Sequence, residues 1–304
     1  MNKWEAFSKI MISQENTGYC WLASALNCLE HKSLISGNFS LRSYIFQDKM
    51  LKAQAYLKQI YNQRANSAKP NKAARLGSNP TTDHGTWAMA AALVSEQGVL
   101  LDYDKPQSQL CTEQLNNELS FLLNYCAYEL IETNCDKPIA YYLNLVQQVL
   151  EKHLGECSHS SVANSFPFED YSLISRMGYL QFNDLVKAQL DQDDYVWISC
   201  DANLFYNPQT HFFDDKTICN SRNLPLSFTK LSHSDICSYK MATQRHAMTL
   251  VGYELTPSGI ILSAYNSKHP PDESGYCSMS ASWFTKYSFS AAIKKELIEN
   301  VSCQ

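Results

Sequence analysis

The hydrophobic periodicity of the chain changes close to residue 170, and this change constrains the fold more than any other feature. Before it, apolar residues recur at helical spacing and end at turn residues such as Gly98. Helices are predicted for residues 20–31, 40–63, 85–98 and, as two patterns, 111–153. A serine cap opens the second helix. Polar residues at 64–80 and 154–170 are predicted to connect these elements.

The second half contains short β-rich runs that are bounded by turn residues. Strands are predicted for residues 194–202, 246–255, 259–267, 275–280 and 287–293, with a long loop over 205–223. Helices followed by strands are typical of an α+β protein. We expect one domain over residues 1–304, mainly helical in 1–170 and mainly β in 171–304.

Composition narrows the class of protein and its partners. The 304 residues carry a net charge of −5 without a long run of like charges, so neither nucleic acid nor an anionic membrane is expected as a partner. Eleven cysteines, an odd number without a CxxC pair, favour neither a disulfide framework nor a zinc site. We therefore expect no metal and no cofactor.

No apolar core of a secretion signal is visible, so a cytoplasmic location is predicted, with signal-less export left open.

The stretch SQENTGYCWLASALN, residues 13–27, places Cys20 where a polar loop passes into a predicted helix. A helix N-terminus lowers the pKa of a thiol and favours the reactive thiolate. Gly18 allows the backbone to turn sharply just before the cysteine. The alternative is a structural cysteine buried at a helix start, which is common for free cysteines.

Three more residues complete a set with which a thiol nucleophile could work. His246 opens the run RHAMTLVGYEL and is a candidate base, and Asn266 ends the next predicted strand, where its amide oxygen could accept the imidazole N–H. Gln14 and the backbone N–H of Cys20 could donate to an oxyanion. Taken singly, each residue also has a purely structural explanation. His246 could be a histidine at a strand edge, Asn266 a turn residue and Gln14 a loop residue.

Six ordered blocks resemble the papain-like cysteine peptidases, in particular the bleomycin hydrolase and aminopeptidase C branch. The blocks are QENTGYCWLASALN, FSLRSYIFQDKM, NPTTDHGTWAMAAALVSEQGVL, DDYVWISCDANLFYN, RHAMTLVGYEL and YNSKHPPDESGYCSMSASWF. They span residues 14 to 284. The resemblance implies a papain-like fold with two lobes, one helical and one β-barrel-like, and a cleft between them.

The resemblance also implies a role for individual residues. Cys20 would be the nucleophile, His246 the general base and then acid, and Asn266 the group that orients the imidazole. Gln14 would help to form the oxyanion hole. The candidates for substrate contact are Gly85, which matches a family glycine, His84, which replaces the preceding glycine, and Trp21.

The sequence departs from the family in two respects. Lys268 stands where the family has a tryptophan that shields the histidine–asparagine hydrogen bond. The chain is also shorter than its relatives, which carry helical insertions that help to build a hexamer and a C-terminal arm that restricts cutting to the substrate N-terminus. The oligomeric state and the choice between exopeptidase and endopeptidase therefore stay open.

Three functions are compatible with the sequence. The first is a peptidase that hydrolyses peptide or aminoacyl-amide substrates through an acyl-enzyme on Cys20, aminopeptidase-like by resemblance. The second is a transferase that passes the same acyl group to another nucleophile, and the third is a catalytically degenerate binding protein. Asp83, just before His84, is expected to cap a helix or to be a solvated charge.

Overall fold

The helices predicted for the first half are confirmed. The computed structural model describes residues 11–32, 38–65, 80–102, 110–133, 137–157, 168–178, 180–216, 229–269 and 274–302. Its first half contains α1 (Cys20–Lys32), α2 (Leu41–Ala65), α4 (Trp87–Gln97), α5 (Glu113–Glu132) and α6 (Ile139–Leu154). The serine cap is present, since Ser40 Oγ accepts the Ser43 N–H. Gly98 ends α4 with a φ of 69°, a conformation that favours glycine.

The second half forms an eight-stranded sheet in the order β3-β10-β4-β7-β8-β9-β6-β5. All neighbouring strands are antiparallel except β6 and β9, which are parallel. The predicted strands are confirmed as β4 (Val196–Cys200), β7 (His246–Thr256), β8 (Gly259–Tyr265), β9 (Tyr276–Ser280) and β10 (Ser288–Lys294). The chain is thus an α+β protein.

Several short elements were not predicted from the sequence. They are β3 (Tyr171–Ser175), β5 (Tyr206–Asn207), β6 (Phe212–Phe213), α7 (Phe182–Asp191), α9 (His233–Ser238), α10 (Ala281–Tyr287), α11 (Lys295–Ser302), the two-residue strands β1 (Asn38–Phe39) and β2 (Leu101–Asp102), and the 3-10 turns 168–170 and 176–178. The expectation of a loop over 205–223 was therefore wrong for β5 and β6. Two-residue strands are too short to show periodicity, and β6 forms because it pairs with the distant β9.

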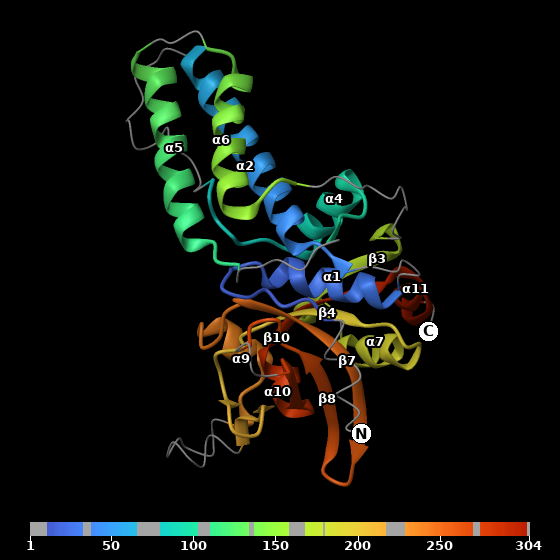
Figure 1. The fold of residues 1–304 in the computed structure, drawn as a ribbon. Helices are drawn as coiled ribbons and strands as arrows, with labels where there is room; N and C mark the ends of the chain where they lie inside the picture. Colours follow the sequence, from blue (N-terminus) through green and yellow to red (C-terminus); the bar gives the residue numbers. More distant parts are fainter. Residues whose placement is uncertain are drawn as a thin grey trace.

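Helix α1 lies between the helical lobe and the sheet (Figure 1). Its second turn is hydrogen-bonded to β7, because Ser24 Oγ donates to the Ala247 carbonyl and Thr249 Oγ1 donates to the Ser24 carbonyl, both at 3.1 Å. Trp197 Nε1 on β4 donates to the Trp21 carbonyl at 3.0 Å. These buried contacts fix the first turns of α1 against the start of β7.

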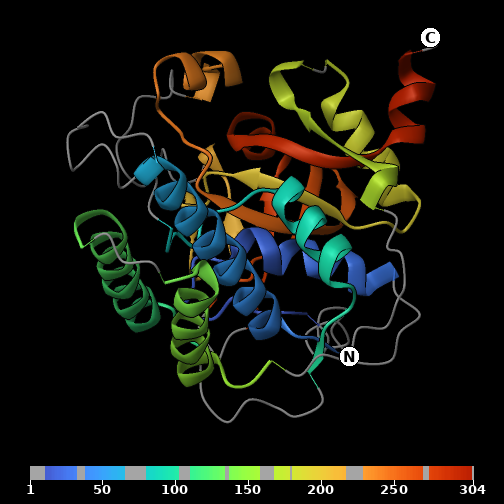
Figure 2. The same cartoon turned by 90° about the horizontal axis from the view of Figure 1, so that it is seen from above.

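The described C-terminal residues lie at the other end of α1. Asp194 forms ion pairs with Lys32, the last residue of α1, and with Lys294, which precedes α11. Because α1 rises about 1.5 Å per residue, this junction lies roughly 18 Å along the helix from Cys20. Figure 2 shows α11 on the opposite side of the molecule from α2, α5 and α6. No helix among the described ranges combines the length and apolar character that crossing a membrane requires.

Candidate active site

Cys20 is the first residue of α1 and is partly buried. Burial raises the pKa of its thiol, while hydrogen bonds from the backbones of Ala247 and Trp21 and the positive charge of Lys268 lower it without outweighing burial. Ala247 directly follows His246 on β7. The hydrogen bond from Ala247 therefore brings the first residues of β7 to the Cys20 sulfur.

His246 and Asn266 form the hydrogen bond that the sequence suggested. His246 Nε2 lies 2.7 Å from Asn266 Oδ1. The pKa of His246 is lowered to about 4, mainly by burial; the hydrogen bond to Asn266 raises the pKa and the nearby charge of Lys268 lowers it, and both effects are included in that value. Asn266 follows the last residue of β8, and the antiparallel pairing of β7 with β8 brings it beside the start of β7. The contact uses Nε2 of the imidazole, so Nδ1 is the ring nitrogen that it leaves available.

Gln14 is buried and is joined to the residue that follows Asn266. Its backbone N–H donates to the Ser267 carbonyl at 3.0 Å, and the Ser267 hydroxyl donates to Gln14 Oε1 at 3.1 Å. Gln14 Nε2 donates to the Thr17 carbonyl. The structure thus brings together all four residues proposed to be catalytic, Gln14, Cys20, His246 and Asn266, through contacts that link the loop before α1 with the ends of β7 and β8.

The three candidates for substrate contact occupy different environments. His84 is exposed and Gly85 is partly exposed, so both are accessible to a ligand. Trp21 is only 2% exposed, and its Nε1 donates to the Asp83 carbonyl at 2.7 Å. A Cβ atom on Gly85 would lie 2.3 Å from the Trp21 ring. Because its ring is covered by Gly85, Trp21 supports the Asp83–Gly85 segment from behind and offers no surface for substrate contact, which corrects the expectation for this residue.

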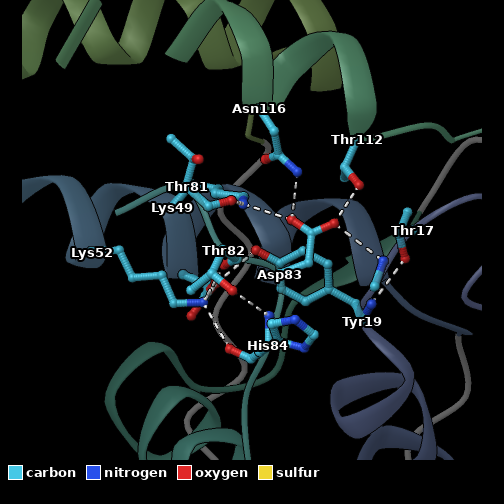
Figure 3. A network of polar contacts seen from close by, with 12 residues as sticks. Thr17, Tyr19, Lys49, Lys52, Thr81, Thr82, Asp83, His84, Thr112 and Asn116 are labelled. Carbon is cyan, nitrogen blue, oxygen red and sulfur yellow. Dashed lines mark hydrogen bonds and ion pairs between the residues drawn. The ribbon is translucent and has the colours of Figure 1, made fainter. Parts of the chain in front are cut away.

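Asp83 is partly buried, with a side chain that is 13% exposed, and its carboxylate accepts several hydrogen bonds, which corrects the expectation that it caps a helix or is solvated. Its carboxylate accepts from the Gly18 N–H at 3.1 Å, from Thr112 Oγ1 and from Asn116 Nδ2, and it forms a 2.7 Å ion pair with Lys49. The Lys49 side chain is fully buried. Figure 3 shows Lys49, Thr112 and Asn116 converging on Asp83. Helix α4 is capped by Thr86 instead.

Burial tends to raise the pKa of Asp83, but the charge of Lys49 and the hydrogen bonds from Lys49, Thr112 and Asn116 outweigh it and lower the pKa. Asp83 is therefore ionised and joins α2, α5 and the loop before Cys20. A Cβ atom on Gly18 would lie 2.6 Å from Asp83 Cβ, so only glycine permits this close approach.

A second set of contacts supports the same segment. Tyr19 is fully buried, and its hydroxyl donates to Asp48 Oδ2 at 2.6 Å. Lys52 pairs with Asp48 at 2.7 Å and donates to the carbonyls of Thr82 and His84, as Figure 3 shows for the last two. The block FSLRSYIFQDKM was recognised in the sequence, but its Asp48 and Lys49 carry the local signal of an ordinary amphipathic helix, so their role in the site was missed.

Two cavities adjoin Asn266 and the loop before Cys20, and Lys268 lines both of them. The larger, of about 880 Å³, is bordered by Thr17, Gly18 and Asp83 and by the N-terminal turn of α5. The smaller, of about 170 Å³, is bordered by Asn266 and by residues of the β5–β6 segment. Among the described side chains, no group of three or more His, Cys, Asp and Glu residues is arranged as metal ligands would be.

Comparisons with known proteins agree with this architecture. The sequence matches the Peptidase C1-like family over residues 5–150 and 175–304. It is 22% identical to aminopeptidase C of Lactococcus lactis subsp. cremoris, in an alignment that covers 94% of this chain and 80% of that protein. It is 21% identical to aminopeptidase W of Lactobacillus delbrueckii subsp. lactis, over 93% of this chain and 80% of that protein.

A solved structure shares the fold. PepW from Lactobacillus rhamnosis HN001 superimposes with a TM-score of 0.73 at 18% identity, covering 97% of this chain and 84% of that one. The family match extends over most of the sequence and includes both lobes. The chain therefore belongs to the Peptidase C1-like family and is a cysteine peptidase with the papain-like fold.

Proposed function

We propose that the chain hydrolyses peptide or aminoacyl-amide bonds through an acyl-thioenzyme on Cys20, with His246 as base and acid and Asn266 as the group that orients it. The observation that carries this proposal is the 2.7 Å contact between His246 Nε2 and Asn266 Oδ1 beside a cysteine at a helix start. With Nε2 committed to Asn266, Nδ1 is the nitrogen that exchanges a proton with Cys20.

The reaction begins with transfer of the Cys20 proton to His246 Nδ1. Burial disfavours each charge taken alone, as the raised pKa of Cys20 and the lowered pKa of His246 indicate. When both groups ionise together, each charge stabilises the other, so the pair forms at lower cost than either ion alone. The thiolate then attacks the carbonyl carbon, the carbon–nitrogen bond breaks, and His246 returns its proton to the leaving amine.

Water completes the cycle by attacking the thioester while His246 accepts its proton, which releases the acid and restores the thiol. The oxyanion of each tetrahedral intermediate would be bound by the Cys20 backbone N–H and by Gln14. An amide nitrogen carries two N–H bonds, and the contact of Gln14 Nε2 with the Thr17 carbonyl uses one of them. The second N–H is the group proposed to face the oxyanion.

The proposal includes aminopeptidase specificity because the relatives found by sequence are named aminopeptidase C and aminopeptidase W. Residues of α11 up to Ser302 lie at the far end of α1 from Cys20, so the described part of the C-terminus is not the group that would recognise a substrate amine. His84 and Gly85, accessible on the segment supported by Trp21, are proposed to contact the substrate.

The test uses fluorogenic aminoacyl amides with a free or an acetylated amino group. Wild-type protein is expected to hydrolyse the free form, whereas Cys20→Ala and His246→Ala lose hydrolysis. Cys237→Ala, which changes a partly buried cysteine in α9, is the matched control and is expected to retain it. Hydrolysis that survives in Cys20→Ala would contradict the mechanism. Equal rates on free and acetylated substrates would contradict the aminopeptidase assignment alone.

A further inference from the structure

Lys268 lies beside the pair formed by His246 and Asn266, and no carboxylate among the described residues forms an ion pair with it. Its backbone N–H donates to Asn266 Oδ1 at 3.1 Å, while its side chain is exposed. Its charge lowers the pKa of both Cys20 and His246, in agreement with an ammonium group near the reacting atoms.

The smaller cavity extends from Lys268 along the side of Asn266. Its volume is about 170 Å³, and its polar lining includes Lys268, Asn266, His211 and His269 together with Tyr206 and Tyr276. None of the described residues that line it is an aspartate or a glutamate. The larger cavity differs, since Glu15, Asp83 and Glu113 border it. An anion is therefore favoured in the smaller cavity and disfavoured at the acidic wall of the larger one.

The lining of the smaller cavity is already ordered. Tyr206 contacts His211 Nδ1 through its hydroxyl at 3.0 Å, and the two rings lie edge to face. Tyr276 is 6% exposed and packs edge to face against Tyr265. A ligand would thus enter a cavity whose walls need little rearrangement, which reduces the entropic cost of binding.

The proposed reaction determines which part of a substrate reaches this cavity. His246 must protonate the leaving nitrogen, so the residue that leaves lies next to His246 and Asn266, where the smaller cavity opens. We propose that Lys268 is a specificity-determining residue that binds a carboxylate on the leaving residue. That carboxylate is either the free C-terminus of a residue directly after the scissile bond or an acidic side chain at that position. This inference rests on the proposed function and adds a substrate class to it.

The experiment compares kcat/KM for matched pairs of substrates. An aminoacyl-alanine with a free carboxylate is compared with its amide, and an aminoacyl-aspartate amide is compared with the aminoacyl-asparagine amide. Wild-type protein is expected to prefer the carboxylate in at least one pair by about tenfold, which corresponds to one charge-assisted hydrogen bond. The pair that shows the preference distinguishes a C-terminal carboxylate from an acidic side chain.

Three variants assign the preference to Lys268. Lys268→Met is expected to reduce the ratio to about one, whereas Lys268→Arg keeps most of it because the charge remains. Lys295→Met removes an exposed lysine at the start of α11 and is expected to leave the ratio unchanged. Each ratio compares two substrates on the same variant. A general loss of activity that a Lys268 variant causes through Cys20 and His246 therefore cancels in the ratio.

Two results would overturn the inference. One is a wild-type protein without a preference for the carboxylate, and the other is a preference that persists in Lys268→Met. An aminoacyl coumarin amide, which has no carboxylate, separates this inference from the proposed function. Its hydrolysis without any carboxylate preference would contradict the inference alone, while failure to hydrolyse any of the substrates would contradict both.

Discussion

His246 Nε2 lies 2.7 Å from Asn266 Oδ1, and this contact fixes the imidazole at the point where β7 begins. Asn266 also accepts the backbone N–H of Lys268 at the same oxygen, at 3.1 Å. The asparagine is therefore held by the chain that follows β8 and not only by the histidine. The contact commits Nε2 of the imidazole to Asn266 and leaves Nδ1 for the proposed proton exchange with Cys20.

Asn266→Ala is expected to lower kcat/KM by about 10- to 100-fold, the effect of losing one hydrogen bond to a charged group. The hydrogen bond to Asn266 raises the pKa of His246, so its loss disfavours the imidazolium that the reaction requires. The pH dependence of kcat/KM for an aminoacyl amide measures the effect. Unchanged activity in Asn266→Ala would show that the contact does not orient the base.

Gly85→Ala is expected to destabilise the protein by about 1–3 kcal/mol and to lower activity. The added Cβ would lie 2.3 Å from the buried Trp21 ring, so the segment that carries His84 and Gly85 must move. Gly252→Ala is the matched control, because no atom lies within 4 Å of its added Cβ. Urea unfolding measures both variants, and equal stability of the two would contradict the packing of Gly85 on Trp21.

Asp83→Asn is expected to cost about 3–5 kcal/mol of unfolding free energy, because it leaves the fully buried Lys49 without a counter-charge. Asp191→Asn breaks an exposed pair with Lys187 on α7, weakens an exposed contact with the Tyr253 hydroxyl, and is expected to cost far less. Combining Asp83→Asn with Lys49→Met is expected to recover part of the loss. A cost for Asp83→Asn no larger than that of the control would contradict the role of the buried pair.

Asp83 also makes the unfolding free energy depend on pH in the acidic range. The pKa of Asp83 is lowered in the folded protein, so its contribution is present above the unfolded value of 3.8 and is lost as pH falls through the folded value. The difference in unfolding free energy between wild type and Asp83→Asn is therefore expected to shrink below pH 4. A difference that stays constant across this range would contradict the assignment.

Glu30 on α1 provides a pH prediction of the opposite sign. Burial raises its pKa to about 7, although a hydrogen bond from the Phe39 backbone lowers it, and its Oε2 has no hydrogen-bond partner among the described residues. The folded state binds this proton more tightly, so stability is lost as pH rises from about 4.5 to about 7. Glu30→Gln is expected to be more stable than wild type by roughly 1–2 kcal/mol at pH 8, allowing for partial exposure of Glu30.

Thermal or urea unfolding of the wild type and of Glu30→Gln at pH 4 and at pH 8 measures this effect. At pH 4 both side chains are neutral, and the two proteins are expected to have nearly equal stability. A gap of the same size at both pH values would show that packing, and not the ionisation of Glu30, separates them.

The sequence predicted those parts of the fold that have strong local patterns. The helices from α1 to α6 and the strands β4, β7, β8, β9 and β10 follow from their periodicity and their turn residues. Strands β5 and β6 did not follow, because a two-residue strand carries no periodic pattern and depends on a partner far along the chain. Helix α10 was missed where its sequence, ASWFTKY, directly continues a β-rich run.

The candidate site was also predicted only in part. Gln14, Cys20, His246 and Asn266 were selected as residue types in a known order, and the structure brings them together. The role of Asp83 could not be predicted, because it depends on Lys49, Thr112 and Asn116, which lie on two other helices or at their start. Trp21 was expected to contact substrate, but the close approach of Gly85 covers its ring.

The central claim is that Cys20 is activated by His246, and the rate at which each cysteine is alkylated tests it most directly. Limited iodoacetamide at pH 6, followed by mass spectrometry of the peptides, compares Cys20 with the other ten cysteines. Burial raises the pKa of Cys28, Cys126, Cys200 and Cys277, so these are expected to react slowly. The exposed Cys111 serves as an internal reference.

Cys20 is expected to react at least about tenfold faster than Cys111 in the wild type, because proton transfer to His246 and the pairing of the two charges outweigh the burial that raises the pKa of the thiol alone. In His246→Ala the rate at Cys20 is expected to fall to that of Cys111 or below it. Labelling of Cys20 no faster than that of the other cysteines, or a fast rate that persists in His246→Ala, would contradict the account.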